Sequence, residues 1–231
     1  DLAPYLFMNS KYRLLTVDAA GTLIRPWPSV GAVYAQTARE HGLIVEDEEI
    51  DTRFYKIFGQ TQKNKKSTMG AEKDFWRSVV CETFQPYGTE KQLHPIFEKL
   101  WDLFAHGDHW KLAEGAKTTL QTLRNRGYEI ALLSNNDTRL RQVITELGIT
   151  SLFDQIFISA EIGYEKPDTE IFRHVETSMH RKPQEILHIG DSHSRDFEGA
   201  LSAGWSALLF GKPKIEDNQI LSFPELLDHL P

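Results

Sequence analysis

Alternation between short apolar runs and helical segments from Leu112 onward constrains the fold more than any other feature of this sequence. Four runs have the length and composition of buried strands. Between them, apolar residues recur every three or four positions, the spacing of an amphipathic helix. The four runs are residues 129–133, 155–159, 185–189 and 205–209. Strands that alternate with helices in this way predict βαβ units and a parallel sheet.

An earlier apolar run, residues 14–17, is separated from this pattern by residues 28–107, which have helical spacing throughout and no convincing strand. We therefore predict an α/β fold, a doubly wound parallel five-stranded sheet with an inserted helical cap. The core domain would comprise residues 11–27 and 108–231, and the cap domain residues 28–107. Residues 1–10 precede the first strand, and we interpret them as an arm or a tag remnant.

Composition excludes several classes of partner. A formal net charge of −7 argues against nucleic acid or an anionic membrane, because both require a basic surface. The single cysteine, Cys81, excludes an intrachain disulfide and suits a reducing compartment. No apolar run reaches the roughly 18 residues of a membrane span, and no signal-peptide pattern opens the chain. We expect a cytoplasmic protein that binds neither nucleic acid nor membrane.

Polar residues follow the first four of the five predicted strands. In chain order they are Asp18, Ser134, Asn135, Lys166, Asp191 and Asp196. In an open α/β sheet, ligands bind outside the carboxyl ends of the strands, so these residues are expected to share one cleft. A carboxylate, a hydroxyl, an ammonium group and an acidic pair can together hold a divalent cation, bind a phosphoryl group and attack it.

The order and context of these residues resemble the four motifs of the haloacid dehalogenase-like (HAD) hydrolase superfamily. The motifs correspond here to Asp-Ala-Ala-Gly-Thr at 18–22, Leu-Ser-Asn at 133–135, Lys-Pro-Asp at 166–168, and residues 190–196, which begin Gly-Asp and end in Asp. The insertion at 28–107 lies where such enzymes carry a cap domain. The resemblance thus covers essentially the whole chain and implies a Rossmann-like core with hydrolase activity.

The resemblance also implies catalytic and substrate-binding roles. Asp18 would be the nucleophile and would form a covalent aspartyl intermediate. Ser134 would hydrogen-bond the transferring group, and Lys166 would offset the negative charge of the site. We expect Thr22 and Asn135, together with Ser134 and Lys166, to bind the substrate, a small phosphorylated molecule.

The implied metal is Mg²⁺, which favours few carboxylates together with water and phosphate oxygens. Its ligands would be Asp18, Asp191 and the backbone carbonyl of Ala20. Asp191 could also be a loop acid without a metal. Asp196 would be a supporting acidic residue, or it could serve the first turn of the helix that follows. His193, in the same loop, is a candidate proton carrier.

Ordinary structural roles are open for other residues. Asp18 could cap a turn, Ser134 could be a strand-end hydroxyl, and Lys166 could be a surface lysine. Asp168 precedes a predicted helix and is expected to cap its N-terminus. His188 lies within the fourth strand and reads as a core histidine.

Ala20 stands where phosphatases of this superfamily carry a second aspartate, which protonates the leaving oxygen and then activates water. General acid–base catalysis of this kind contributes about 10²- to 10⁴-fold. We therefore expect a Mg²⁺-dependent phosphatase of small phosphorylated metabolites that acts through an aspartyl-phosphate intermediate and is weakened by this loss.

Two alternatives are open. A 2-haloacid dehalogenase also lacks that aspartate, since halide leaves without a proton. Such enzymes usually carry Tyr at the position of Ala20, however, and lose the Gly-Asp that this chain keeps at 190–191. The other alternative is a catalytically impaired protein that retains the fold for binding.

Overall fold

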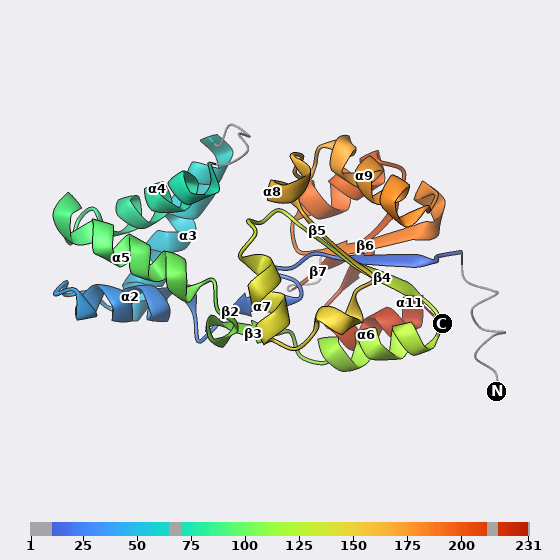
Figure 1. The fold of residues 1–231 in the computed structure, drawn as a ribbon, viewed down its shortest axis with the longest axis horizontal. Helices are drawn as coiled ribbons and strands as arrows, with labels where there is room; N and C mark the ends of the chain where they lie inside the picture. The colour runs from blue at the N-terminus through green and yellow to red at the C-terminus, as the bar shows by residue number, and fades with distance from the viewer. Residues whose placement is uncertain (1–10, 65–70, 212–216, 231) are drawn as a thin grey trace. The chain divides into compact units, whose positions relative to one another are not determined.

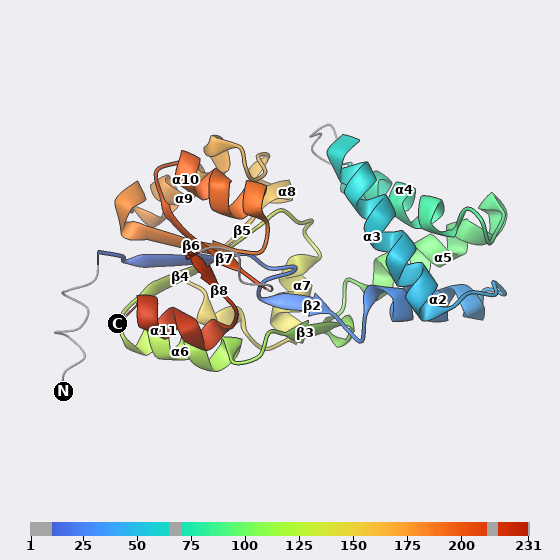
Figure 2. The same ribbon diagram turned by 180° about the vertical axis from the view of Figure 1, so that it is seen from behind.

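The computed structural model describes residues 11–64, 71–211 and 217–230. The expected arm at residues 1–10 lies outside this part of the chain. The described residues form two compact units. One unit contains the described residues of 1–25, 112–138 and 147–231, and the other contains those of 26–111 and 139–146. Figures 1 and 2 show the elements of each unit.

A parallel sheet forms the centre of the first unit. Its strands are β1 (Leu14–Val17), β4 (Glu129–Ser134), β5 (Gln155–Ile158), β6 (Ile186–Gly190), β7 (Ser206–Phe210) and β8 (Gln219–Ile220). They lie in the order β5-β4-β1-β6-β7-β8, with every pair parallel. The predicted parallel α/β sheet is confirmed, with one strand more than expected. The extra strand, β8, has two residues and is too short to show a periodic pattern.

Helices cover both faces of this sheet (Figures 1 and 2). On one face lie α9 (Thr169–Met179) and α10 (Gly199–Ser202), and on the other lie α6 (Ala116–Asn125) and α11 (Leu226–His229). The short helix α8 (Ser159–Ile162) follows β5. Apolar residues of α9 and α10 form one buried cluster with those of the strands. The strands are buried on both faces, which explains why they appear in the sequence as continuous apolar runs.

The described part of the insertion contains four α-helices: α2 (Val30–Glu40), α3 (Asp47–Asn64), α4 (Glu72–Phe84) and α5 (Glu90–Leu103). The Ser29 side chain caps α2 by accepting a hydrogen bond from the Ala32 N–H at 3.0 Å. Apolar and aromatic residues of the four helices form a single buried cluster. The helical cap region predicted from the sequence is therefore present.

The remaining elements are short. The strands β2 (Ile24–Pro26) and β3 (Trp110–Leu112) pair with each other at the two ends of the insertion, and α7 is Leu140–Glu146. The single-turn 3-10 helices are η1 (Gly107–His109), η2 (Thr150–Leu152), η3 (Pro183–Glu185) and η5 (Phe223–Glu225), and η4 (His193–Glu198) is a π-helix. None of the helices in the described ranges is long and apolar enough to span a bilayer.

Candidate active site

The strand order reverses at β1. From β1 the chain continues to β4 and β5 on one side, and then to β6, β7 and β8 on the other. The carboxyl edge at such a reversal is where doubly wound sheets bind ligands. Asp18 directly follows β1, Asp191 directly follows β6, and Ser134 is the last residue of β4. The topology therefore brings these three positions to one edge of the sheet.

The turn after β1 approaches the loop after β6 very closely at Gly21. A Cβ atom at this position would lie 2.4 Å from Asp191 Oδ2, which is far inside van der Waals contact. The φ angle of Gly21 is +100°, a conformation that disfavours side chains. Glycine at this position thus allows Asp191 to lie against the turn that carries Asp18.

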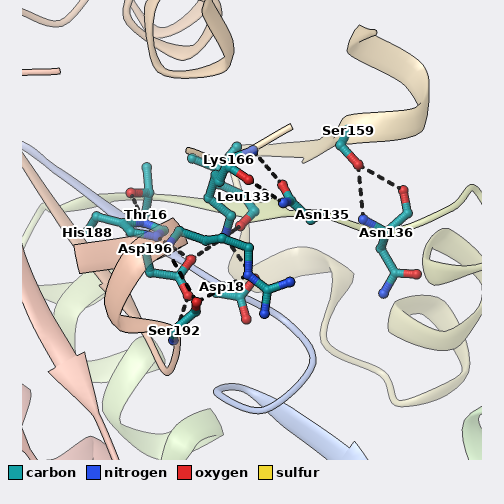
Figure 3. A network of polar contacts seen from close by, with 11 residues as sticks. Thr16, Asp18, Leu133, Asn135, Asn136, Ser159, Lys166, His188, Ser192 and Asp196 are labelled. Carbon is teal, nitrogen blue, oxygen red and sulfur yellow. Dashed lines mark hydrogen bonds and ion pairs between the residues drawn. The ribbon is translucent and has the colours of Figure 1, made fainter. Parts of the chain in front are cut away.

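Lys166 links two buried carboxylates. Its Nζ atom donates hydrogen bonds to Asp18 Oδ1 at 2.8 Å, to Asp196 Oδ1 at 2.5 Å and to the Leu133 carbonyl at 2.8 Å (Figure 3). The Lys166 side chain is only 2% exposed. An ammonium group has three N–H donors, and all three are used here. Lys166 is therefore a buried, fully hydrogen-bonded cation rather than a surface lysine.

Burial and charge act in opposite directions on these groups. Burial raises the pKa of Asp18 to about 6, with Asp196 and Asp191 adding to the rise and Lys166 opposing it. Burial also favours the neutral form of Lys166, but Asp18 and Asp196 outweigh it and raise the pKa of the ammonium. The same ammonium and His188 hold the pKa of Asp196 well below its ordinary value despite its burial. Lys166 and Asp196 therefore form a charged pair, whereas Asp18 still lacks full compensation by positive charge.

The residues present fit a divalent cation. Asp18, Asp191 and Asp196 each place a carboxylate oxygen within 4.8 Å of the others. The Asp196 oxygens already accept hydrogen bonds from Lys166, His188 and the Ser192 N–H. Asp18 Oδ2, by contrast, has no hydrogen-bond donor within the described part of the chain. Carboxylate oxygens such as those of Asp18 and Asp191 are the donors that Mg²⁺ prefers.

The comparisons with known proteins agree with this geometry. The family model of haloacid dehalogenase-like hydrolases matches residues 12–204. The chain belongs to the haloacid dehalogenase-like hydrolase family. It is 34% identical to haloacid dehalogenase-like hydrolase domain-containing protein 3 of Mus musculus, over 85% of this chain and 81% of the mouse protein.

Two further proteins are similar to this chain, a relative that is named for its activity and a solved structure with a similar fold. The chain is 36% identical to glyceraldehyde 3-phosphate phosphatase of Methanothermobacter thermautotrophicus, over 62% of this chain and 63% of that protein. Among solved structures, the fold is similar to the HAD-hydrolase YfnB from Bacillus subtilis, crystallised with magnesium. That structure gives a TM-score of 0.77 at 19% identity and covers 95% of this chain and 98% of its own.

The Asn135 side chain of this HAD hydrolase is hydrogen-bonded to the backbone of Lys166. Its Nδ2 donates to the Lys166 carbonyl, and its Oδ1 accepts from the Lys166 N–H, both at 2.7 Å (Figure 3). One amide side chain thus holds both backbone groups of Lys166. The sequence predicted Asn135 as a substrate-binding residue, and its position as a brace for Lys166 was missed. The two residues are 31 positions apart, and no local pattern links them.

The other predicted residues are distributed as follows. Ser134 is buried at the end of β4, and Thr22 is buried just after Asp18. Thr22 Oγ1 is a buried polar atom without a hydrogen-bond partner among the residues that the structure describes. His193 is half exposed, with Nδ1 3.7 Å from Glu198 Oε1. The Asp168 side chain accepts from the Glu170 N–H and caps α9, as expected.

His188 and its neighbour Thr16 are hydrogen-bonded to the network and were not predicted as part of the site. His188 is completely buried, which confirms its reading as a core histidine, but its ring nitrogens contact Thr16 and Asp196. The available signal was Thr16 itself. It interrupts the apolar run two residues before Asp18, and alternate residues of a strand point to the same face.

Proposed function

We propose that this HAD hydrolase is a Mg²⁺-dependent phosphatase of small phosphorylated metabolites, with Asp18 as the nucleophile. The observation that carries the proposal is the state of the Asp18 carboxylate. One oxygen is fixed 2.8 Å from the Lys166 ammonium, and the other has no partner within the described residues. A carboxylate held in this way has one oxygen oriented by the protein and one available for attack. The name of the Methanothermobacter relative, glyceraldehyde 3-phosphate phosphatase, supports the same class of substrate, a small phosphorylated molecule.

Asp18, Asp191 and the Ala20 carbonyl would hold the cation. No hydrogen bond within the described residues uses the Ala20 carbonyl, which leaves it available as a ligand. When bound, Mg²⁺ offsets the negative charge of these carboxylates and of the phosphoryl oxygens. We propose that Ser134 and Thr22 contribute hydroxyl groups to the phosphoryl site, and that Lys166 supplies its remaining positive charge.

In the first step, the free Asp18 oxygen attacks phosphorus and the bond from phosphorus to the ester oxygen breaks. The alkoxide or phenolate leaves, and the phosphoryl group is now bonded to Asp18. In the second step, water adds to phosphorus, loses a proton to solvent, and displaces the Asp18 carboxylate. Lys166 keeps its contacts to Asp18 and Asp196 throughout. Its positive charge therefore continues to offset the negative charge of the site as charge moves onto the phosphoryl oxygens.

Ala20 offers no proton in either step. The leaving oxygen must therefore take its proton from water, which penalises alkoxides more than phenolates because alkoxides are stronger bases. General acid–base catalysis by a positioned side chain typically contributes about 10²- to 10⁴-fold. We propose that this HAD hydrolase is correspondingly weak on alkyl phosphates and stronger on aryl phosphates.

The test compares hydrolysis of an aryl phosphate by the unmodified chain and by Asp18→Asn, with and without Mg²⁺. We expect Mg²⁺-dependent turnover that falls by about 10⁴-fold or more in the variant, as for other catalytic nucleophiles. Asp154→Asn is the matched control, because Asp154 lies at the opposite, amino end of β5 and contacts Arg124. Metal-independent turnover, or equal turnover in both variants, would contradict the proposal.

Ala20→Asp tests the missing acid directly. We expect turnover of an alkyl phosphate to rise, up to about 10²-fold, while turnover of an aryl phosphate changes much less. The side chain of Ala20 is exposed, so the new carboxyl has room to reach solvent. Equal gains on both substrates, or none, would count against a missing acid as the limiting feature.

The dehalogenase alternative rests on the same residue, since halide leaves without a proton and needs no acid at position 20. It predicts halide release from 2-haloacids without any metal. Retention of Asp191 beside Asp18 favours the phosphatase. Absence of both activities would leave the HAD fold as a binding protein.

A further inference from the structure

On the face of the sheet where Asp18 lies, the preceding side chain, Thr16, is already polar. Leu14, Thr16 and Asp18 alternate along the strand and point to the same face, and Leu14 belongs to the apolar cluster beneath α9. In the parallel ladder, Thr16 is paired in register with His188 of β6. Both side chains are completely buried. A buried hydroxyl and a buried imidazole therefore lie side by side directly behind the site.

These two side chains continue the Lys166 network into the sheet. Thr16 Oγ1 lies 2.8 Å from His188 Nδ1, and His188 Nε2 lies 3.1 Å from Asp196 Oδ1. The same Asp196 oxygen accepts from Lys166, which also donates to Asp18. Figure 3 shows this chain of contacts from Thr16 to the nucleophile. Thr16 of β1 and Asp18, which directly follows β1, are thus joined through three side chains from other elements.

The chemistry of the groups fixes the direction of each hydrogen bond. An ionised carboxylate only accepts, so His188 Nε2 must carry the proton that it shares with Asp196. Burial lowers the pKa of His188, which favours the neutral ring. Nδ1 of a neutral ring with a proton on Nε2 is an acceptor, and the Thr16 hydroxyl therefore donates to it. The hydroxyl of Thr16 thereby satisfies Nδ1 of His188 and fixes the orientation of the ring.

Aromatic rings hold the imidazole in this orientation. Phe172 of α9 lies edge-on to the ring with centroids 6.3 Å apart, and Trp205 lies 6.4 Å away. Interiors as tightly packed as this one allow little reorientation of a ring. If the proton moved to Nδ1, Nε2 would present a lone pair to the Asp196 carboxylate, and that contact would become repulsive.

We propose that Thr16 and His188 are positioning residues, which lock the Asp196 carboxylate so that Lys166 stays on Asp18. The proposal rests on the phosphatase function proposed above for its kinetic consequence, but its structural part is independent of any reaction. Residues that orient a ligand through its second hydrogen bond typically change activity by about 10- to 100-fold when they are removed. A purely structural hydroxyl would lower stability without this effect on turnover.

The kinetic test compares Thr16→Val, which removes the hydroxyl at nearly constant shape, with Thr16→Ser, which keeps it. We expect Thr16→Val to lower kcat for an aryl phosphate about 10- to 100-fold with KM nearly unchanged, and Thr16→Ser to restore most of kcat. Thr83→Val is the matched control. Thr83 is equally buried and donates its hydroxyl to the Val79 carbonyl in helix α4. Equal kcat in Thr16→Val and Thr83→Val, or no rescue by serine, would overturn the proposal.

The second readout needs no substrate and no metal. The tautomer of His188 is read from the ring nitrogen shifts of ¹⁵N-histidine-labelled protein, with His188→Gln used to assign the signals. We expect the Nε2–H tautomer in the unmodified chain, in Thr16→Ser and in Thr16→Val, with the Nδ1 signal of Thr16→Val alone shifted to that of an acceptor nitrogen without a hydrogen bond. An Nδ1–H tautomer in the unmodified chain, or the same Nδ1 signal in Thr16→Val as in the unmodified chain, would overturn the proposal even if kcat falls. If the unmodified chain hydrolyses no phosphate, the proposed function fails while this measurement still decides the tautomer.

Discussion

The α/β unit and the helical insertion bury very different kinds of side chain. In the α/β unit, Lys166, Asp18 and Asp196 are almost entirely removed from solvent and compensate one another. In the insertion, the buried cluster is apolar and aromatic, and ion pairs such as Lys73 with Glu98 lie at the surface. Burying charge is costly unless every charge is paired, and apolar residues of similar volume would often give equal or greater stability. We therefore propose that the charges of the α/β unit are kept for chemistry, whereas the buried residues of the insertion serve packing.

The largest effect is expected from Lys166→Met, which keeps the length of the side chain and removes its charge. Asp18 and Asp196 would then be buried carboxylates without a cation. We expect a loss of about 3–5 kcal/mol in the free energy of unfolding, measured by urea denaturation, together with loss of turnover.

The matched control is Lys73→Met in the insertion. It breaks the 2.7 Å contact to Glu98 at the surface, where solvent screens the pair, and should change stability much less. Equal losses in the two variants would break the comparison between buried and exposed charge.

Phe84→Ala in the insertion is expected to lower the free energy of unfolding by a similar amount, through lost packing. Phe84 is completely buried and stacks on Tyr34 with ring centroids 5.9 Å apart. Truncation of a buried phenylalanine typically costs about 3–5 kcal/mol. Unfolding should be followed by urea denaturation and far-UV circular dichroism. Ile44→Ala is the control, because Ile44 is 92% exposed and its loss should stay within about 0.5 kcal/mol.

A smaller effect is expected from Asn135→Ala, which leaves the N–H and carbonyl of Lys166 without their side-chain partner. An unsatisfied, partly buried backbone group costs about 1–3 kcal/mol. Turnover should fall as well, because the ammonium is then less well placed. Asn125→Ala, which removes an exposed contact to Gln121, should change neither stability nor turnover. A variant with normal kcat and a raised KM would instead support the substrate-binding role predicted for Asn135.

Features that depend on a local sequence pattern could be predicted, whereas features that depend on contacts between distant residues could not. The strands β1, β4, β5, β6 and β7 were predicted because continuous burial leaves a continuous apolar run. The sixth strand, β8, was missed because two residues carry no periodicity. At the site, Asp18 and Lys166 were expected at one edge of the sheet, and they lie in contact there. Their roles, and the cap boundaries at residues 28–107, stay predictions.

The sequence by itself determined, to within one residue, where β1, β4, β5, β6 and β7 end, because a buried strand leaves an apolar run of its own length. It also determined which polar residues follow the first four of these strands, at the edge where ligands bind. Only the tertiary structure decided which partner each polar residue takes. Lys166 and Asp18 are 148 positions apart, and Thr16 and His188 are 172 positions apart. Hydrogen bonds require a donor and an acceptor placed to within a fraction of an ångström, and that placement comes from the packing of the whole α/β unit rather than from any segment of its sequence.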